Sequence, residues 1–207
     1  MEQSFGRSRF FTVAASMLIA GSLVSCSPRV GDSIVLDTVP RTEQETYSRL
    51  GAGKSLAVGM FNDARTPVVT GEGTSAYTEA SGDVARLAEQ SLTHALKSQG
   101  YQVSPTSPYR LAGQITKWRT KVTTKATAQI QSEAAIQVQV LDNRNNVVYN
   151  GSYVGTRSSE GPVVSKNDIR NSLSVALATA TAQVAEDQKL IQALNTTPTN
   201  GTNTHAY

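Results

Sequence analysis

This chain is short of the residues that build disulfides, metal sites and aromatic cores. Its 207 residues include one cysteine, one tryptophan and two histidines. One cysteine rules out an internal disulfide, and the two histidines have no partners at metal-ligand spacing. Aromatic residues make up only 6% of the chain, so we expect the core to consist mainly of Val, Ile, Leu and Ala, and packing alone to stabilise the fold.

Neither positive nor negative charge is in large excess. Lysine and arginine number 19 against 16 aspartates and glutamates, which gives a formal net charge of +3. A balance this close to neutral does not favour nucleic acid as a partner. The sequence contains no G-x-S-x-G element, and its few histidines give little support for nucleophilic catalysis. We therefore expect no enzymatic activity, no metal and no noncovalent cofactor.

The one cysteine lies in a bacterial lipoprotein-processing site. Arg7 and Arg9 precede an apolar stretch over residues 10–24, and the sequence LVSC follows, ending at Cys26. A charged region, an apolar region and a small residue before the cut form the layout of a secretory signal peptide. We predict cleavage between Ser25 and Cys26, with covalent N-acyl and S-diacylglycerol groups on Cys26.

Two other interpretations of this segment remain open. A retained transmembrane helix needs about 20 apolar residues, whereas residues 10–24 supply 15. A protein secreted without lipid would carry Cys26 as a lone free thiol in an oxidising compartment. Asp after the cysteine retains lipoproteins in the inner membrane in enterobacteria-like sorting. Here the residue is Ser27, so we expect an outer-membrane protein that faces the periplasm.

Composition divides the chain into four predicted parts. Residues 1–25 form the signal peptide, and residues 26–53 comprise the lipidated cysteine and a flexible tether. Residues 54–194 form a single α+β domain. Residues 195–207 are a polar tail with too little apolar content to fold. Inside the tether, the apolar residues 34–36 suit either an edge strand or an extended leash.

Hydrophobic periodicity predicts the order strand, helix, three strands, helix. The strands are expected over residues 55–61, 109–124, 125–141 and 147–156, and the first helix over residues 83–99. A capping-box pattern at Ser165 and Asp168 begins the second helix, which continues or restarts towards residue 194. Apolar side chains recur at three-and-four spacing in both helices. Over residues 128–140 they alternate with glutamines, as in a half-buried strand. Residues 70–82 are rich in Gly, Ser and Thr and are predicted to form a loop.

This order predicts an α+β fold, with an antiparallel sheet of about four strands and two amphipathic helices packed on one face. Packing both helices on the sheet buries their apolar stripes. The other face of the sheet then remains open to water. The glutamines that alternate with apolar residues, Gln129, Gln131, Gln137 and Gln139, fit this open face.

A row of cations forms the main candidate binding surface. Lys117, Arg119, Lys121 and Lys125 share one side of the strand pattern, and Trp118 faces the other way. The row is consistent with a solvated face that blocks aggregation. It is also consistent with a basic strip that attracts lipid headgroups, lipopolysaccharide phosphate or peptidoglycan carboxylates, an attraction that salt would weaken.

A second candidate lies at the end of the predicted strand 55–61. Asp63 and Arg65 are two residues apart, followed by a proline that stops the strand. This pair fits a local ion pair that closes the turn. The alternative is a contact point for a partner.

Five short stretches of the chain are distinctive beyond their periodicity. They are the lipobox at Cys26, LAVGMFNDAR over 56–65, LKSQGYQV over 96–103, LAGQITKW over 111–118 and EDQKLIQAL over 186–194. Together they resemble the YajG-type family of Gram-negative outer-membrane lipoproteins over roughly residues 54–194. The resemblance implies an envelope location and the fold above, and it brings no catalytic residues with it.

These observations predict a non-enzymatic outer-membrane lipoprotein that binds another envelope component. The expected partners are the membrane, through the lipid anchor, and an envelope protein, lipopolysaccharide or peptidoglycan; nucleic acid is not expected. The alternative is an auxiliary lipoprotein subunit of an envelope lipid or glycan transport system.

The lipobox yields a direct prediction for Cys26→Ala. Without the thiol no diacylglycerol is attached, so the variant should accumulate as a soluble or signal-anchored precursor. Radiolabelled palmitate incorporation and membrane fractionation of the two proteins would measure this. A variant that is still acylated and still fractionates with the outer membrane would contradict the lipoprotein interpretation.

Overall fold

The structure is a computed structural model that describes residues 33–36, 49–66 and 75–195. The predicted signal peptide, the cleavage site at Ser25 and Cys26, and residues 196–207 of the predicted tail lie outside the described residues.

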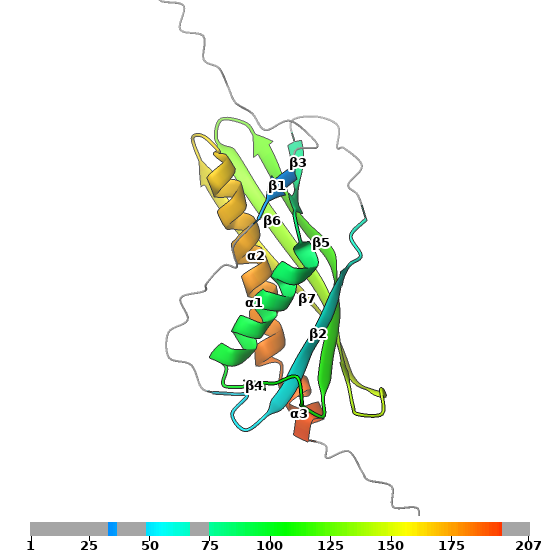
Figure 1. Cartoon of the computed structure of the whole chain (residues 1–207). Helices are drawn as coiled ribbons and strands as arrows, with labels where there is room; N and C mark the ends of the chain where they lie inside the picture. The colour runs from blue at the N-terminus through cyan, green and yellow to red at the C-terminus, as the bar shows by residue number, and fades with distance from the viewer. Residues whose placement is uncertain (1–32, 37–48, 67–74, 196–207) are drawn as a thin grey trace, which may run out of the picture.

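Among the described residues, seven strands form one mixed sheet and three helices pack on it (Figure 1). The strands are β1 (Ser33–Val35), β2 (Ser55–Asp63), β3 (Ser75–Ser81), β4 (Gln102–Val103), β5 (Arg110–Thr124), β6 (Ala128–Leu141) and β7 (Val147–Gly161). The helices are α1 (Val84–Ser98), α2 (Lys166–Glu186) and α3 (Gln188–Asn195). The α+β class is therefore confirmed.

Strand β5 is the centre of the sheet. It pairs with β6 in antiparallel register over its whole length, and β6 pairs in the same way with β7. The other edge of β5 is shared by two strands. Residues 110–115 pair with β2 in parallel, and residues 119–123 pair with β3 in antiparallel register. The short strands β4 and β1 extend these two halves of the sheet.

The predicted antiparallel sheet of about four strands with two helices is wrong in the number of elements, since the described residues form seven strands and three helices, and in strand direction. Three strand pairs are parallel: β1 with β3, β2 with β4, and β2 with β5. A parallel pair needs a long crossover between its strands, and β3, α1 and β4 all lie in the chain between β2 and β5. The sequence pattern marks the strands but not the direction in which they pair.

Strand β3 was not expected, because residues 70–82 were predicted to form a loop. Its sequence, SAYTEAS, lacks a run of large apolar residues. Small side chains nonetheless alternate along it, and Thr78 and Ala80 are buried. Strand β1 pairs with β3, which decides between the two interpretations of residues 34–36 in favour of the edge strand. Ile34 and Leu36 are buried there, although they precede the predicted start of the domain at residue 54.

Local capping signals place the helix ends. The Asp83 side chain accepts a hydrogen bond from the Arg86 backbone N–H at the start of α1, and Gly100 follows its end with φ 87°. Ser165 and Asp168 form the predicted capping box at the start of α2. The chain breaks at Asp187 and restarts as α3, so the second predicted helix is two helices.

The core lies between the helices and the sheet. Trp118 is 1% exposed, and its indole Nε1 donates a hydrogen bond of 2.9 Å to the Leu173 carbonyl of α2. On the same side of the sheet, the buried hydroxyls of Thr120 and Ser132 bond each other at 2.5 Å. These contacts place one face of β5 and β6 beneath α2. The residues that alternate with Trp118, Thr120 and Ser132 along the two strands therefore face water.

Helix α2 lies very close to β7 at Gly155. A Cβ atom placed on Gly155 would lie 2.0 Å from the Ala176 carbonyl oxygen and 2.5 Å from the Ala180 backbone nitrogen. Both neighbours are backbone atoms of α2, which cannot turn aside as a flexible side chain can. Glycine at this position therefore sets the distance between helix and sheet.

We predict that Gly155→Ala lowers the free energy of unfolding by about 2–3 kcal/mol, because the methyl group forces α2 away from β7. Chemical denaturation followed by circular dichroism would measure the change. Gly161→Ala is the matched control, since its nearest neighbour to a new Cβ lies at 3.5 Å, and it should stay within about 0.5 kcal/mol of the wild type. Equal effects of the two substitutions would contradict the close contact.

Candidate functional site

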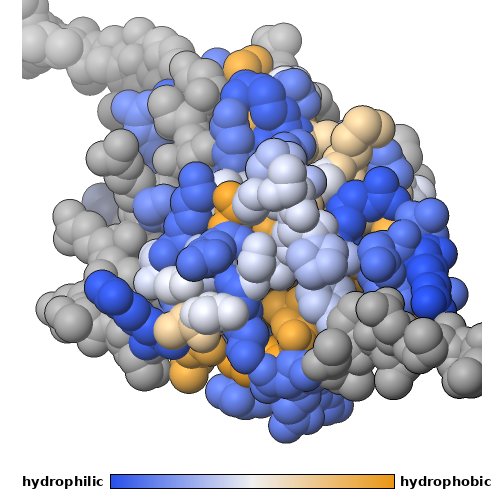
Figure 2. All heavy atoms as spheres, turned by 60° about the horizontal axis from the view of Figure 1, so that its bottom comes forward, coloured by the Kyte–Doolittle hydropathy of each residue, from blue (hydrophilic) through white to orange (hydrophobic). Residues whose placement is uncertain are grey.

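The face of the molecule seen in Figure 2 is mainly hydrophilic. In Figure 2, which turns the lower end of the molecule forward, hydrophilic residues cover most of the view and apolar ones show in small areas. Large exposed apolar side chains are scattered over β1, β2, β7 and one loop, as Val35, Met60, Val147, Val148, Val154 and Val163. None of the described helices has the length and apolar content of a membrane span, and no three metal-ligating side chains of these residues cluster.

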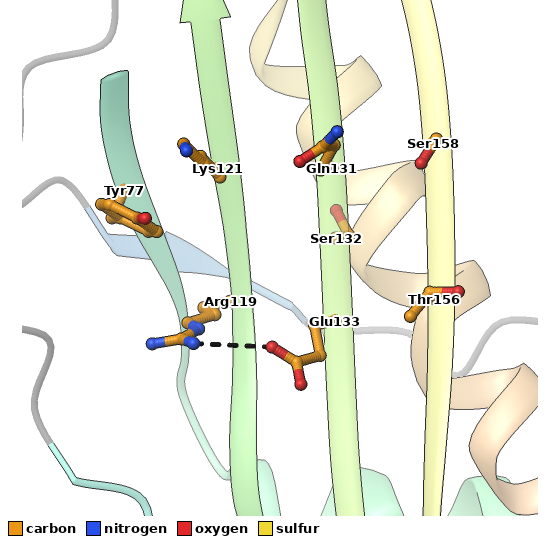
Figure 3. A pocket seen from close by; sticks show the side chains of 8 residues that line it. All are labelled: Tyr77, Arg119, Lys121, Gln131, Ser132, Glu133, Thr156 and Ser158. Atoms are coloured by element: carbon orange, nitrogen blue, oxygen red, sulfur yellow. Dashed lines mark ion pairs between the residues drawn. The ribbon is translucent and has the colours of Figure 1, made fainter. Parts of the chain in front are cut away.

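A pocket of about 390 Å³ lies on the face of the sheet opposite the helices. Its lining comes from four strands, β3, β5, β6 and β7 (Figure 3), and comprises Tyr77, Arg119, Lys121, Gln131, Ser132, Glu133, Thr156 and Ser158. We call this the open-face pocket. Ser132 is the exception among these residues, because its side chain is buried on the helix side of the sheet, against Thr120.

Strand register places the other side chains in two rows across the sheet. In the first row Tyr77 lies beside Lys121, Lys121 beside Gln131, and Gln131 beside Ser158. In the second row, Arg119 pairs with Glu133 and Glu133 with Thr156. Side chains that alternate along a strand share one face, so both rows face the water.

Glu133 balances part of the positive charge of this face. Its carboxylate lies 3.2 Å from Lys117 Nζ and 3.5 Å from Arg119 Nη2. The three side chains are 30–48% exposed, so each ion pair contributes little stability. Lys121 forms no ion pair with any described residue, and it therefore keeps an uncompensated charge at the pocket.

Tyr77 brings an aromatic ring to the pocket. The Arg119 guanidinium carbon lies 5.8 Å from the ring centroid, and Lys121 Nζ lies 6.0 Å from it. Both distances are within the range of a cation–π contact. Tyr77, Arg119 and Lys121 thus lie on the β3–β5 side of the pocket, where Arg119 also pairs with Glu133 of β6 (Figure 3).

The structure separates the predicted binding residues into groups. Lys117, Arg119 and Lys121 lie together on the open face of β5. Lys125 lies beyond the end of β5, in the turn to β6, where its backbone N–H donates to the Thr127 carbonyl. Asp63 and Arg65 lie at the end of β2, outside the lining of the open-face pocket.

Asp63 and Arg65 form the local ion pair that was one of the two interpretations. Arg65 Nε and Nη2 bond the two carboxylate oxygens of Asp63 at 2.7 and 2.8 Å. Its Nη1 also donates to the Ala80 carbonyl of β3 at 2.6 Å. The hydrogen bond from Arg65 lowers the pKa of Asp63 more than burial raises it. Arg65 thus joins the ends of β2 and β3, which share one edge of β5.

A second polar cluster lies where α2 meets α3. The hydroxyls of Tyr149 and Tyr153 contact each other, and each donates a 2.6 Å hydrogen bond to Asp187 Oδ2. Burial and the bond to this carboxylate raise the pKa of Tyr149 to about 12 and that of Tyr153 further. Asp187 Oδ1 also accepts from the Lys189 N–H at the start of α3. The cluster thus connects Asp187, where α2 ends and α3 begins, to β7.

Sequence reasoning did not find this cluster or the tyrosine of the pocket. Tyr149 and Tyr153 are four residues apart on one strand face, and Asp187 is distant in the chain. Tyr77 lies within the segment predicted to be a loop. Only the pairing of strands and helices brings these residues to their partners.

Residues 63–195 match the model of a family described as uncharacterized lipoproteins. The chain belongs to this lipoprotein family. Membership implies a lipid anchor on a membrane, in agreement with the lipobox at Cys26. No curated protein is significantly similar in sequence to this lipoprotein.

Several solved structures align with the lipoprotein. A protein from Xanthomonas campestris aligns with a TM-score of 0.50 and 12% identity, over 74% of this chain and 91% of its own. A minor lipoprotein from Acinetobacter baumannii aligns with a TM-score of 0.39 and 14% identity, over 64% of this chain and 92% of its own. PelC of Paraburkholderia phytofirmans, solved as a dodecamer, aligns with a TM-score of 0.38 and 18% identity, over 76% of this chain and 98% of its own. At such identities, the Xanthomonas structure supports the fold and nothing about activity.

The Asp187 cluster predicts how stability depends on pH. Burial raises the pKa of Asp187, but hydrogen bonds from Tyr149, Tyr153 and the α3 backbone outweigh it, so the net pKa is below its ordinary value. A lowered folded-state pKa contributes stability above the unfolded value of about 3.9, and this contribution is lost as pH falls through the folded value.

We therefore expect Asp187→Asn to reduce the free energy of unfolding at pH 7 by about 1–2 kcal/mol, because charge-assisted hydrogen bonds are lost. The difference from wild type should shrink as pH falls below about 4. Urea denaturation at a series of pH values would measure both curves, and Tyr153→Phe should give a smaller change of the same kind. Parallel curves for Asp187→Asn and wild type would refute the role of this carboxylate.

Proposed function

We propose that this lipoprotein is a non-enzymatic protein of the outer membrane that faces the periplasm and binds another envelope component through the open face of its sheet. The open-face pocket carries the proposal. It gathers Arg119, Lys121 and Tyr77 with hydroxyl and amide side chains on the side of the sheet that the helices leave uncovered.

The chemistry of the pocket favours binding over catalysis. Its one carboxylate, Glu133, is already engaged by Lys117 and Arg119. The one described histidine, His94, lies exposed on α1, in the helix layer and not among the pocket residues. A general base has to lie within hydrogen-bond reach of the proton that it removes, and neither residue is placed for that role in this pocket.

The location rests on three features of the sequence. Membership of the lipoprotein family supports a lipid anchor, and Ser27 after the cysteine favours the outer membrane. The resemblance to YajG-type lipoproteins points to the same membrane. The polar surface around the pocket then suits a domain exposed to the periplasm.

In-cell crosslinking tests the binding face. A photo-crosslinking residue at Gln131, on the open face, should capture a defined envelope component, whereas the same residue at Gln90, exposed on α1, should not. Mass spectrometry of the adducts would identify the component. Adducts of equal yield from both positions, or none from Gln131, would contradict the proposal. Capture of an inner-membrane complex from Gln131 would instead indicate an auxiliary transport subunit.

Charge reversal provides the quantitative prediction. The variant Lys117→Glu, Arg119→Glu, Lys121→Glu should lower the Gln131 adduct yield at least about tenfold, because the strip that attracts an anionic partner becomes acidic. The variant loses two exposed ion pairs of about 0.2–1 kcal/mol each and gains like-charge neighbours at Glu133, so thermal melting has to show that it is folded.

The matched control reverses the same number of charges on the helix side. Arg86, Arg170 and Lys189 are exposed near the starts of α1, α2 and α3. Glutamate is tolerated there because it complements the helix dipole. This control should keep the wild-type adduct yield. An equal loss in both triple variants would show an effect of net charge alone, and the proposed face would be wrong.

A further inference from the structure

We propose that the open-face pocket binds an acidic saccharide, a sugar that carries a carboxylate or phosphate group. This inference rests on the proposed function and names the class of ligand. In this arrangement the Tyr77 ring packs against a sugar ring, Lys121 binds the acidic group, and Gln131 and Ser158 bond sugar hydroxyls.

The size and composition of the pocket fit a sugar. Its volume of about 390 Å³ is within the range of about 300–1,000 Å³ for small-molecule sites. The lining provides one aromatic ring and no Val, Leu, Ile or Met side chain, so its apolar surface is the ring and the carbon atoms of otherwise polar side chains. Sugars combine hydroxyls with apolar ring faces, which matches one aromatic ring beside neutral polar groups.

The row Tyr77, Lys121, Gln131 and Ser158 sets the direction of the ligand. Adjacent strands are about 4.8 Å apart, so the row crosses three strand intervals, or roughly 14 Å. Amide and hydroxyl groups at this spacing supply donors and acceptors to successive sugar hydroxyls. The ligand would lie across the strands, with its acidic group nearer β5 than β7.

Charge explains the preference for an acid, and it singles out Lys121. Arg119 pairs with Glu133, and the strand register places Glu79 beside Arg119 on β3. Arg119 therefore already has one carboxylate as an ionic partner, and its neighbour in the β3 register is a second acidic residue. Lys121 has no ionic partner among the described residues, and its contact with Tyr77 lies 6.0 Å from the ring centroid. An anionic group would bind Lys121 at the cost of no existing ion pair.

Titration calorimetry with the full acylated lipoprotein in nanodiscs of neutral lipid would test the inference. The probes are trigalacturonate, which carries three carboxylates, and its methyl ester, which has the same ring hydroxyls without the charge. We expect the acid to bind at least about tenfold more tightly than the ester. A comparison of glucose 6-phosphate with glucose shows whether the pocket also accepts a phosphate as the acidic group.

Substitutions separate the charge from the ring. Lys121→Gln should weaken trigalacturonate about tenfold, to the level of the ester, and leave the ester unchanged. Tyr77→Ala should weaken both probes about fivefold, since the ring packs against either. Lys97→Gln, on the exposed side of α1, is the control and should leave both affinities unchanged. Thermal melting by circular dichroism checks that each variant is folded.

Several results would overturn the inference. The first is equal affinity for the acid and the ester, and the second is unchanged binding by a folded Lys121→Gln variant. The third is binding that Tyr77→Ala does not weaken, because non-specific attraction between the cations and an anion would then account for it. If the saccharides fail while the Gln131 crosslinks persist, the acidic saccharide is wrong and the binding face stands. If both fail, the proposed function fails as well.

Discussion

The pairing of β5 with three strands at once determines where the other elements of this domain lie. One edge of β5 is occupied by β6 along its whole length, and the other is divided between β2 and β3. Arg119 and Lys121 of β5 are therefore flanked on both sides, by β3 and by β6. A side chain there is held by strands from distant parts of the sequence, which is the setting that a binding residue needs to keep its position.

Burial of one face of the sheet gives the opposite face its role. Trp118 is anchored to the α2 backbone through its indole nitrogen, so Lys117 and Arg119 on either side of it point to water. Gly155 lets α2 lie close enough to make this contact with the sheet. Packing on the helix side thus decides which polar residues of the strands meet on the open face, and strand register decides which of them are neighbours.

The sequence predicts elements that depend on local patterns. The helices, the capping box at Ser165 and the three long strands follow from periodicity and end signals within a few residues. Strand β3 was not predicted, because its small and polar residues resemble a loop, and the parallel direction of β2 has no local signal. The cations of β5 were found by their alternation. Tyr77 and Glu133 were not, since register between separate strands brings them to the pocket.

Trp118 is the one tryptophan of the sequence, and its position has a spectroscopic consequence. Intrinsic fluorescence excited at the red edge of absorption comes from a single indole, buried and hydrogen-bonded to the Leu173 carbonyl. Emission from this protein therefore reports on one place, the contact between β5 and α2. The next residue of β5 is Arg119, which lines the open-face pocket. A shift of β5 on that face would reach the chromophore through a single peptide unit, without any label.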